Sequence, residues 1–228
     1  MKNKIIIALD FKTLNEAKKM VDRLKDAVFF KVGLQSFLSF GEEIIEYLKQ
    51  RNKKLFLDLK FKDIPNTVEG AVKSVLRYKP DFLTIHATGG AEMIRRAVET
   101  AKVEPSLTVL GVTILTSLED DDLKQQGGAF NVNDTVLKLC EMGLENGMNS
   151  FVCSPMEISS LKEKFGKDIS LITPGIRPEW SVKGDQKRVF TPKMAIEAGS
   201  DYMVIGRPIT QNVEPNKAFN LIVNEVVS

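Results

Sequence analysis

The stretch LDLKFKDIPNT, residues 57–67, joins the end of a predicted strand to the start of a predicted helix. Alternate residues of a strand share a face, so Asp58 and Lys60 point one way and the two leucines point the other. Pro65 suits the first turn of a helix, and apolar residues follow it at helical spacing. A carboxylate and an ammonium group therefore lie side by side at a strand-to-helix junction.

The rest of the chain repeats this alternation of strand and helix. Short apolar and β-branched runs predict strands at residues 4–9, 28–32, 54–60, 82–86, 107–114, 150–153, 169–173 and 202–205. Helical periodicity follows each of them, and capping residues such as Thr13, Ser154 and Thr191 mark several helix starts. The helix after the second strand is expected from about Gly41, and residues 117–128 are expected to form a polar connection.

Eight strand–helix units in 228 residues leave about 28 residues for each, the size of one βα repeat. Continuous alternation of this kind predicts a parallel sheet, and eight units predict a closed α/β TIM barrel, (β/α)8. The alternative is an open doubly wound sheet, but no Gly-x-Gly-x-x-Gly turn follows the first strand. No linker or charge block interrupts the pattern, so residues 1–228 are expected to form a single catalytic domain.

Composition narrows the classes of partner and of chemistry. The 32 basic and 30 acidic residues nearly cancel, which argues against a nucleic-acid partner or a polybasic membrane surface. A single histidine leaves little room for histidine-based triads or metal sites. Cys140 and Cys153 have no metal or redox spacing and are expected to be small buried hydrophobes in a reducing compartment. With no signal peptide and no membrane-spanning run, a cytoplasmic location is expected.

Charged residues gather where the first three strands end. In a barrel of this type the catalytic groups lie at the carboxyl ends of the strands, and the parity of each strand turns Asp10, Lys31, Asp58 and Lys60 inward. The alternative interpretation is a set of structural ion pairs or solvated strand ends. Buried charge is costly unless it is paired, and barrels normally fill with aliphatic residues, so the group as a whole indicates a functional site. Carboxylates on either side favour the charged form of Lys60, which suits it to deliver a proton as a general acid.

The last two strands end in glycine and arginine. Gly206-Arg207 follows the eighth strand, and Pro174-Gly175-Ile176-Arg177 follows the seventh. These loops commonly hold a phosphate in this fold, because glycine exposes backbone N–H groups and arginine adds a bidentate clamp. Turn glycines and solvated arginines are the alternative. Residues 177–190 lack periodicity and are predicted to form a lid that brings Gln186 to the phosphate, with a merely mobile loop as the alternative.

Two further polar residues end strands. His86 is predicted to form hydrogen bonds at its strand end rather than to act as a catalyst. Thr116 is suited either to contact the edge of a heterocycle or to stabilise a local turn.

The motif Asp58-x-Lys60-x-x-Asp63-x-x-Asn66-Thr67, together with Lys31 upstream and the Thr-Pro-Gly-Ile-Arg and Ile-Gly-Arg segments downstream, resembles the bacterial type of the orotidine 5'-phosphate decarboxylase family. The resemblance covers essentially the whole chain. It implies a reaction that needs no cofactor and no metal, in which orotidine 5'-phosphate loses CO2 to give UMP, the last step of de novo pyrimidine nucleotide synthesis.

The resemblance also implies roles for individual residues. Catalysis would fall to Lys60, the proton donor to C6 of the pyrimidine, with Asp58, Lys31 and Asp63. A homodimer with shared sites is implied, in which Asp63 and Thr67 reach the partner's site. The residues expected to bind the substrate are Asp10, Lys31, Asp58, Lys60, Asp63, Ile64, Thr67, Thr116, Pro174, Arg177, Gln186, Gly206 and Arg207.

Two other functions compete with this one. A metal-dependent sugar-phosphate decarboxylase or aldolase of the same barrel superfamily is the first, although the Lys31 ammonium would repel a metal ion at the second strand. A non-catalytic nucleotide-binding barrel is the second, and the intact set of charges speaks against it.

Overall fold

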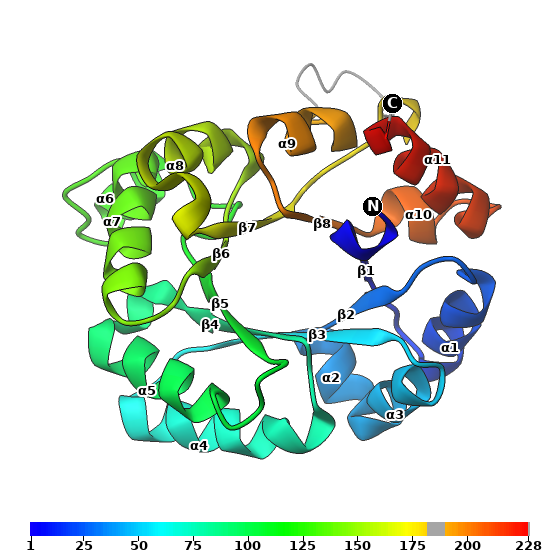
Figure 1. Cartoon of the computed structure of the whole chain (residues 1–228), viewed down its shortest axis with the longest axis horizontal. Coiled ribbons are helices and arrows are strands. Elements are labelled where there is room, and N and C mark those ends of the chain that lie inside the picture. The colour runs from blue at the N-terminus through cyan, green and yellow to red at the C-terminus, as the bar shows by residue number, and fades with distance from the viewer. Residues whose placement is uncertain (182–189, 228) are drawn as a thin grey trace.

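The computed structural model describes residues 1–181 and 190–227 and contains one closed barrel of parallel strands, seen end-on as the central ring in Figure 1. The strands are β1 (Ile5–Ala8), β2 (Phe29–Gly33), β3 (Lys54–Phe61), β4 (Phe82–His86), β5 (Thr108–Val112), β6 (Ser150–Val152), β7 (Ser170–Pro174) and β8 (Tyr202–Ile205). The first strand closes the ring, because Ile7 pairs with Phe30 of β2 on one side and with Ile205 of β8 on the other. The predicted eight-stranded barrel is confirmed.

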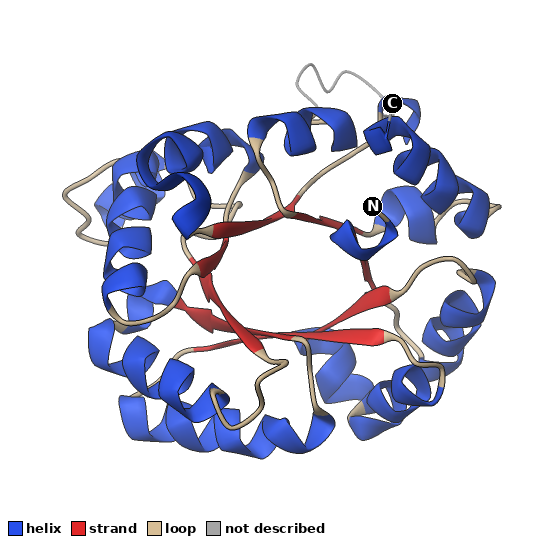
Figure 2. Ribbon diagram, viewed as in Figure 1, coloured by secondary structure: helices blue, strands red, loops and turns tan. Residues whose placement is uncertain are grey.

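Helices surround the ring of strands (Figure 2). They are α1 (Leu14–Arg23), α2 (Leu34–Phe40), α3 (Glu42–Gln50), α4 (Pro65–Val75), α5 (Ala91–Ala101), α6 (Asp120–Gln125), α7 (Val132–Glu145), α8 (Ile158–Phe165), α9 (Pro192–Ala198), α10 (Arg207–Thr210) and α11 (Pro215–Val227). The predicted caps are present: Thr13 and Glu16 form a capping box on α1, and the Thr191 hydroxyl accepts the N–H of Met194 on α9. Within the described ranges, no helix combines the length and apolarity needed to cross a bilayer.

Strand parity divides the apolar residues into two layers. Ile5, Ile7 and Leu9 belong to the large cluster between the strands and the helices, whereas Ile6 and Ala8 belong to a separate cluster inside the barrel. The predicted orientation of β1 is therefore confirmed, and Asp10 continues the inward series. Both cysteines are free and buried, as expected, and burial raises the pKa of the Cys140 thiol to about 12.

Aromatic rings fill the interior below the strand ends. The Phe82 ring lies 5.0 Å from the rings of both Phe29 and Tyr202 and 5.8 Å from that of Phe56, between centroids. Aromatic contacts of this kind add to the stabilisation from burial alone. The rings form an apolar floor. The next inward residues, Lys31 on β2, Asp58 on β3 and Thr84 on β4, lie directly above it.

Three short helices were not predicted. On α2, Leu34 and Leu38 are exposed while Ser36 is buried, so its apolar residues do not follow the usual core-facing pattern. The connection expected over residues 117–128 contains α6, which a capping box between Glu119 and Asp122 starts and which buries only Leu123. One buried apolar residue gives no periodicity to detect. The third, α10, is a single turn.

Candidate active site

Charged side chains replace the aromatic rings at the top of the barrel interior. The Asp58 carboxylate contacts two ammonium groups, with Lys60 Nζ 2.7 Å from Oδ1 and Lys31 Nζ 3.3 Å from Oδ2. Lys31 also lies 3.4 Å from Asp10 Oδ1. The structure thus brings together the four strand-end charges predicted from the sequence, in an order that alternates their signs.

An irregularity in β3 places Lys60. Leu57 pairs with Leu83 and Phe61 with Ile85, so β3 advances four residues while β4 advances two. Within this bulge Lys60 has φ of +51°, in the left-handed region that side chains other than glycine rarely adopt. Its backbone N–H is 2.9 Å from Thr84 Oγ1, and the Thr84 hydroxyl in turn donates to Asp58 Oδ1 at 3.1 Å. Bulges beside active sites commonly re-aim a side chain.

Two opposing effects set the charge of Asp58. Burial by itself would raise the pKa of this carboxyl group, but the charges of Lys31 and Lys60, with hydrogen bonds from Lys60 and Thr84, hold the pKa below its ordinary value. Asp58 is therefore ionised at neutral pH although only 13% of its side chain is exposed. Catalytic sites often keep a buried charge in this way.

A pocket of about 190 Å³, here called the barrel pocket, opens over these groups. Its polar wall holds Lys31, Asp58, Lys60 and Thr116. The remaining lining is largely apolar and comprises Phe56, Val112, Ile114, Leu115, Val152, Cys153, Pro174 and Val204. A flat, mostly apolar ring with a few polar edges matches such a lining. Of the predicted residues, Thr116 and Pro174 join the charged group here.

A second hollow of about 220 Å³, here called the rim pocket, lies between the ends of β1 and β8. Asp10, Lys12, Gly206, Arg207 and Gln211 are among its lining residues. Asp10 contacts Lys31 and so connects the rim pocket to the barrel pocket. Among the described residues Arg207 has no recorded ion pair, which leaves its guanidinium group able to bind an anion.

Other predicted residues lie elsewhere. Asp63, Ile64 and Thr67 are exposed at the start of α4, and none of them lines the barrel pocket. The Ile64 N–H donates to Asp63 Oδ1 at 2.7 Å, which fixes the turn into the helix. Arg177 is half-buried after β7, and its N–H donates to Phe190 O at 3.1 Å. Gln186 and most of the predicted lid lie outside the described residues.

Two residues of β4, His86 and Thr84, also bear on the charged group at the top of the barrel. His86 ends β4 half-buried, and burial followed by the nearby Lys62 and Lys60 charges lowers the pKa of its imidazole. Its side chain makes no hydrogen bond with another described residue, and its predicted hydrogen-bonding role stays a prediction. Thr84 was not predicted. The sequence feature that could have revealed it is a polar residue two positions after Phe82, which places it on the strand face that points into the barrel.

Comparison with a model of a protein family gives a match over almost the whole chain. Residues 3–222 fit the model described as "Orotidine 5'-phosphate decarboxylase / HUMPS family".

Individual proteins give the same result. A protein named orotidine 5'-phosphate decarboxylase from Gloeothece citriformis is 43% identical over 233 residues, which cover 98% of this chain and 97% of that protein. One of the same name from Glaesserella parasuis serovar 5 is 46% identical over 222 residues and covers 94% of this chain and 95% of its own length. The crystal structure of orotidine 5'-phosphate decarboxylase from Lactobacillus acidophilus superposes with a TM-score of 0.88 at 36% identity, covering 98% of this chain and 99% of that one.

Proposed function

This chain belongs to the orotidine 5'-phosphate decarboxylase / HUMPS family, and we propose that it is a carboxy-lyase that converts orotidine 5'-phosphate to UMP and CO2 in pyrimidine nucleotide synthesis. One observation carries the proposal. The Lys60 ammonium group lies in the wall of an otherwise largely apolar pocket, 2.7 Å from a carboxylate that a second lysine also contacts. A fixed cation beside a flat ring is what a decarboxylation without an electron sink requires.

The chemistry follows from the charge that develops on the substrate. When the bond between C6 and the carboxylate breaks, its electron pair remains on C6 as CO2 departs. A cation already fixed beside this carbon stabilises the developing negative charge without reorganisation. Lys60 then transfers a proton to C6, which gives UMP. The bulge at Lys60 supports this role because it directs the side chain into the barrel pocket.

Asp58 acts on the same reaction from the other side. Its ionised carboxylate faces the substrate carboxylate in the proposed complex, and their repulsion is relieved when CO2 leaves. Asp58 also keeps Lys60 and Lys31 in place through its two oxygens. Lys31 and Asp10, which connect the two pockets, are proposed to bind the ribose hydroxyls.

The phosphate is proposed to bind at the rim, where Gly206 and Arg207 lie, with Arg177 and Gln186 completing its contacts. Thr116 and Pro174 line the barrel pocket and are proposed to contact the pyrimidine. Binding energy from the distant phosphate can then hold the ring in the reactive position.

The direct test follows the loss of orotidine 5'-phosphate absorbance after mixing with protein treated with EDTA. We expect UMP to form at the same rate with and without EDTA, and no turnover of the substrate by wild-type protein would refute the proposal. The metal-dependent alternative predicts that EDTA abolishes activity and that Mg²⁺ restores it. Lys31 argues against that alternative, since its ammonium group lies 3.3 Å from Asp58 Oδ2, where a metal ion would need this carboxylate.

We further propose a homodimer in which each protomer completes the other's site. Asp63, Ile64 and Thr67 are exposed and do not line their own barrel pocket, and Ile64 is 66% exposed. Leu34 and Leu38 are also exposed on α2, which follows the neighbouring strand β2. Exposed apolar residues gathered beside an incomplete site favour burial against a second copy of the chain.

Mixing two variants tests the shared site. Asp63→Asn and Lys60→Ala protomers, each poorly active alone, form a mixed dimer in which one site has both native residues. We expect activity to recover toward one functional site per mixed dimer. No recovery in verified mixed dimers would contradict shared sites. A cytoplasmic location and the lack of nucleic-acid or membrane partners remain predictions from the sequence.

A further inference from the structure

Thr84 is the one residue that contacts both the Asp58 side chain and the Lys60 backbone among the described hydrogen bonds. It lies on β4 with 0% of its surface exposed, above the Phe82 ring and facing into the barrel. Its hydroxyl group donates to Asp58 Oδ1 at 3.1 Å and accepts the Lys60 N–H at 2.9 Å. A hydroxyl group has a single hydrogen to donate, so the two bonds together fix the orientation of the Thr84 hydroxyl group and hold the two groups that it contacts.

The first bond controls the orientation of the Asp58 carboxylate. Oδ1 accepts hydrogen bonds from the Thr84 hydroxyl group and from Lys60 Nζ, while Oδ2 lies beside Lys31 Nζ. Rotation of the carboxylate would separate at least one ammonium group from its oxygen. The Thr84 hydroxyl group therefore helps to assign one oxygen to each lysine.

The second bond controls the backbone of Lys60. In the bulge the regular pairing between β3 and β4 is interrupted, and the Lys60 N–H binds a side chain of β4 instead of its backbone. A φ of +51° is unfavourable for lysine and persists only where the surroundings enforce it. The Thr84 hydroxyl supplies that restraint at the residue proposed to deliver the proton.

We infer that Thr84 is a positioning residue, which sets the direction of the Lys60 side chain and the rotation of the Asp58 carboxylate without touching the substrate. This inference rests on the proposed function for its consequence in catalysis. A small displacement of a catalytic group reduces the rate strongly, by about a hundredfold for 1 Å. Thr84 should therefore affect kcat far more than substrate binding.

The test compares Thr84→Val, which keeps the shape and removes the hydroxyl group, with Thr84→Ser, which keeps the hydroxyl group. We expect Thr84→Val to lower kcat by roughly 10- to 100-fold with KM changed less than about threefold. Thr84→Ser should stay within about threefold of wild type in kcat. Ser150→Ala is the control, because it also removes a buried hydroxyl group, but one at the amino end of β6 that donates to Asn149 Oδ1 and does not line the barrel pocket. It should leave kcat within about twofold of wild type.

Three results would overturn the inference: a folded Thr84→Val protein with wild-type kcat, a Thr84→Ser protein as defective as Thr84→Val, or a Ser150→Ala protein that loses as much. If Thr84→Val does not fold, Thr84→Cys replaces it, because a thiol forms weaker hydrogen bonds at a similar size. The kcat of Thr84→Cys should be lower than that of Thr84→Ser but no less than about a tenth of the wild-type value. A wild-type kcat in Thr84→Cys would contradict the inference.

A second readout does not depend on activity. Amide hydrogen exchange at Lys60 should be at least about tenfold faster in Thr84→Val than in Ser150→Ala, because the N–H loses its acceptor. Unchanged exchange would contradict the positioning role. A wild-type protein that does not decarboxylate orotidine 5'-phosphate would instead refute the proposed function, and the exchange measurement would still decide the role of Thr84.

Discussion

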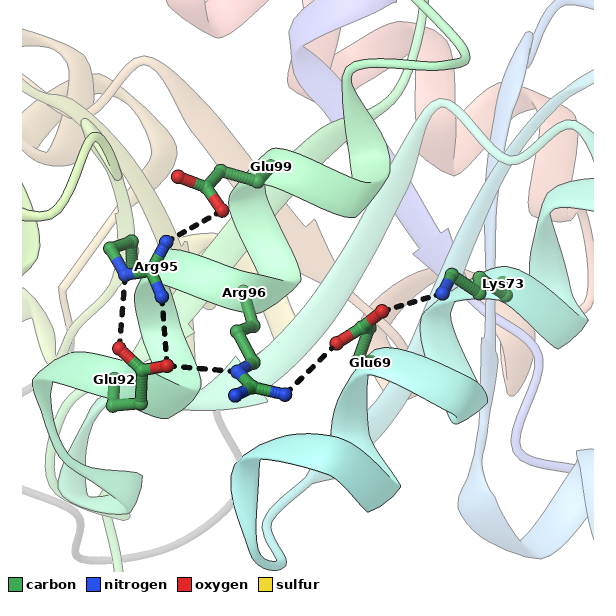
Figure 3. A network of polar contacts seen from close by, with 6 residues as sticks. All are labelled: Glu69, Lys73, Glu92, Arg95, Arg96 and Glu99. Carbon is green, nitrogen blue, oxygen red and sulfur yellow. Dashed lines mark hydrogen bonds and ion pairs between the residues drawn. The ribbon is translucent and has the colours of Figure 1, made fainter.

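Asp58 and Glu69 each bridge two cations, and they differ in their surroundings. Asp58 contacts Lys31 and Lys60 inside the barrel, whereas Glu69 contacts Lys73 and Arg96 between α4 and α5, as Figure 3 shows. The Lys60–Asp58 and Lys73–Glu69 separations are 2.7 and 2.5 Å. Distance alone therefore does not distinguish the two groups.

Their neighbours distinguish them. The Asp58 group has an aromatic floor beneath it and a largely apolar pocket above it. The Glu69 group instead continues along the solvent-facing side of α5 through Glu92, Arg95 and Glu99. An ion pair in a site from which water is largely excluded interacts strongly and pays a large desolvation cost. Exposed pairs contribute little because water and salt screen them. The same side-chain chemistry thus serves catalysis in one place and surface packing in the other.

The largest effect is expected when the buried bridge is removed. Asp58→Ala leaves two ammonium groups facing each other, with Lys31 almost fully buried. We expect a loss of at least about a thousandfold in kcat/KM and a loss of about 3 kcal/mol in the free energy of unfolding. Rates of UMP formation and urea unfolding curves measure the two effects. Near-normal activity in this variant would remove Asp58 from the mechanism.

An intermediate effect is expected at Glu157, which is buried and forms no ion pair with another described residue. Burial raises the pKa of its carboxyl group to about 7 from an ordinary 4.5, while the Ser154 N–H opposes the rise. In the unfolded chain this group ionises near its ordinary pKa, so folding takes up a proton between these two values. The contribution of Glu157 to stability is therefore most favourable below pH 4.5 and declines as the pH rises to about 7.

Glu157→Gln should remove this decline. We compare the free energy of unfolding of the variant with that of wild type by urea unfolding at pH 5 and at pH 8. The difference should shift by about 2 kcal/mol in favour of the variant between pH 5 and pH 8. Glu163→Gln, on the exposed side of helix α8, which begins directly after Glu157, is the control and should show no such difference. Equal pH dependence in wild type and Glu157→Gln would show that this carboxyl group titrates normally in the folded protein.

The smallest effect is expected at the exposed bridge. Glu69→Ala removes the contact to both Lys73 and Arg96, but water can hydrate each cation. We expect the melting temperature to change by less than about 3 °C and the decarboxylation rate to stay within about twofold of wild type. A loss of activity approaching that of Asp58→Ala would mean that burial does not separate the two groups.

Much of the fold was predictable because local and global patterns agree. Strand β4 was predicted over its full length, as was β8, since both are short runs of mainly apolar residues between turn residues. Helix α2 was missed because Leu34 and Leu38 face outward. With its two leucines exposed, α2 shows no core-facing apolar pattern that the sequence could reveal.

Part of the candidate site was predictable from the sequence and part was not. Parity was enough to turn Asp10, Lys31 and Asp58 toward one another, because successive residues of a strand alternate between faces. The left-handed backbone of Lys60 was not predictable, since no glycine marks it and the bulge appears only when β3 pairs with β4. The role of Thr84 depends on that bulge and was hidden with it.

The central claim is that Lys60 performs the reaction because it lines the barrel pocket beside a buried carboxylate, and not merely because it is a lysine paired with a carboxylate. The most direct test compares Lys60→Ala with Lys73→Ala in EDTA-treated protein, by following the loss of orotidine 5'-phosphate. We expect Lys60→Ala to lose at least about a thousandfold in kcat and Lys73→Ala to remain within about twofold of wild type. Full activity in Lys60→Ala, or an equal loss in both variants, would contradict the account.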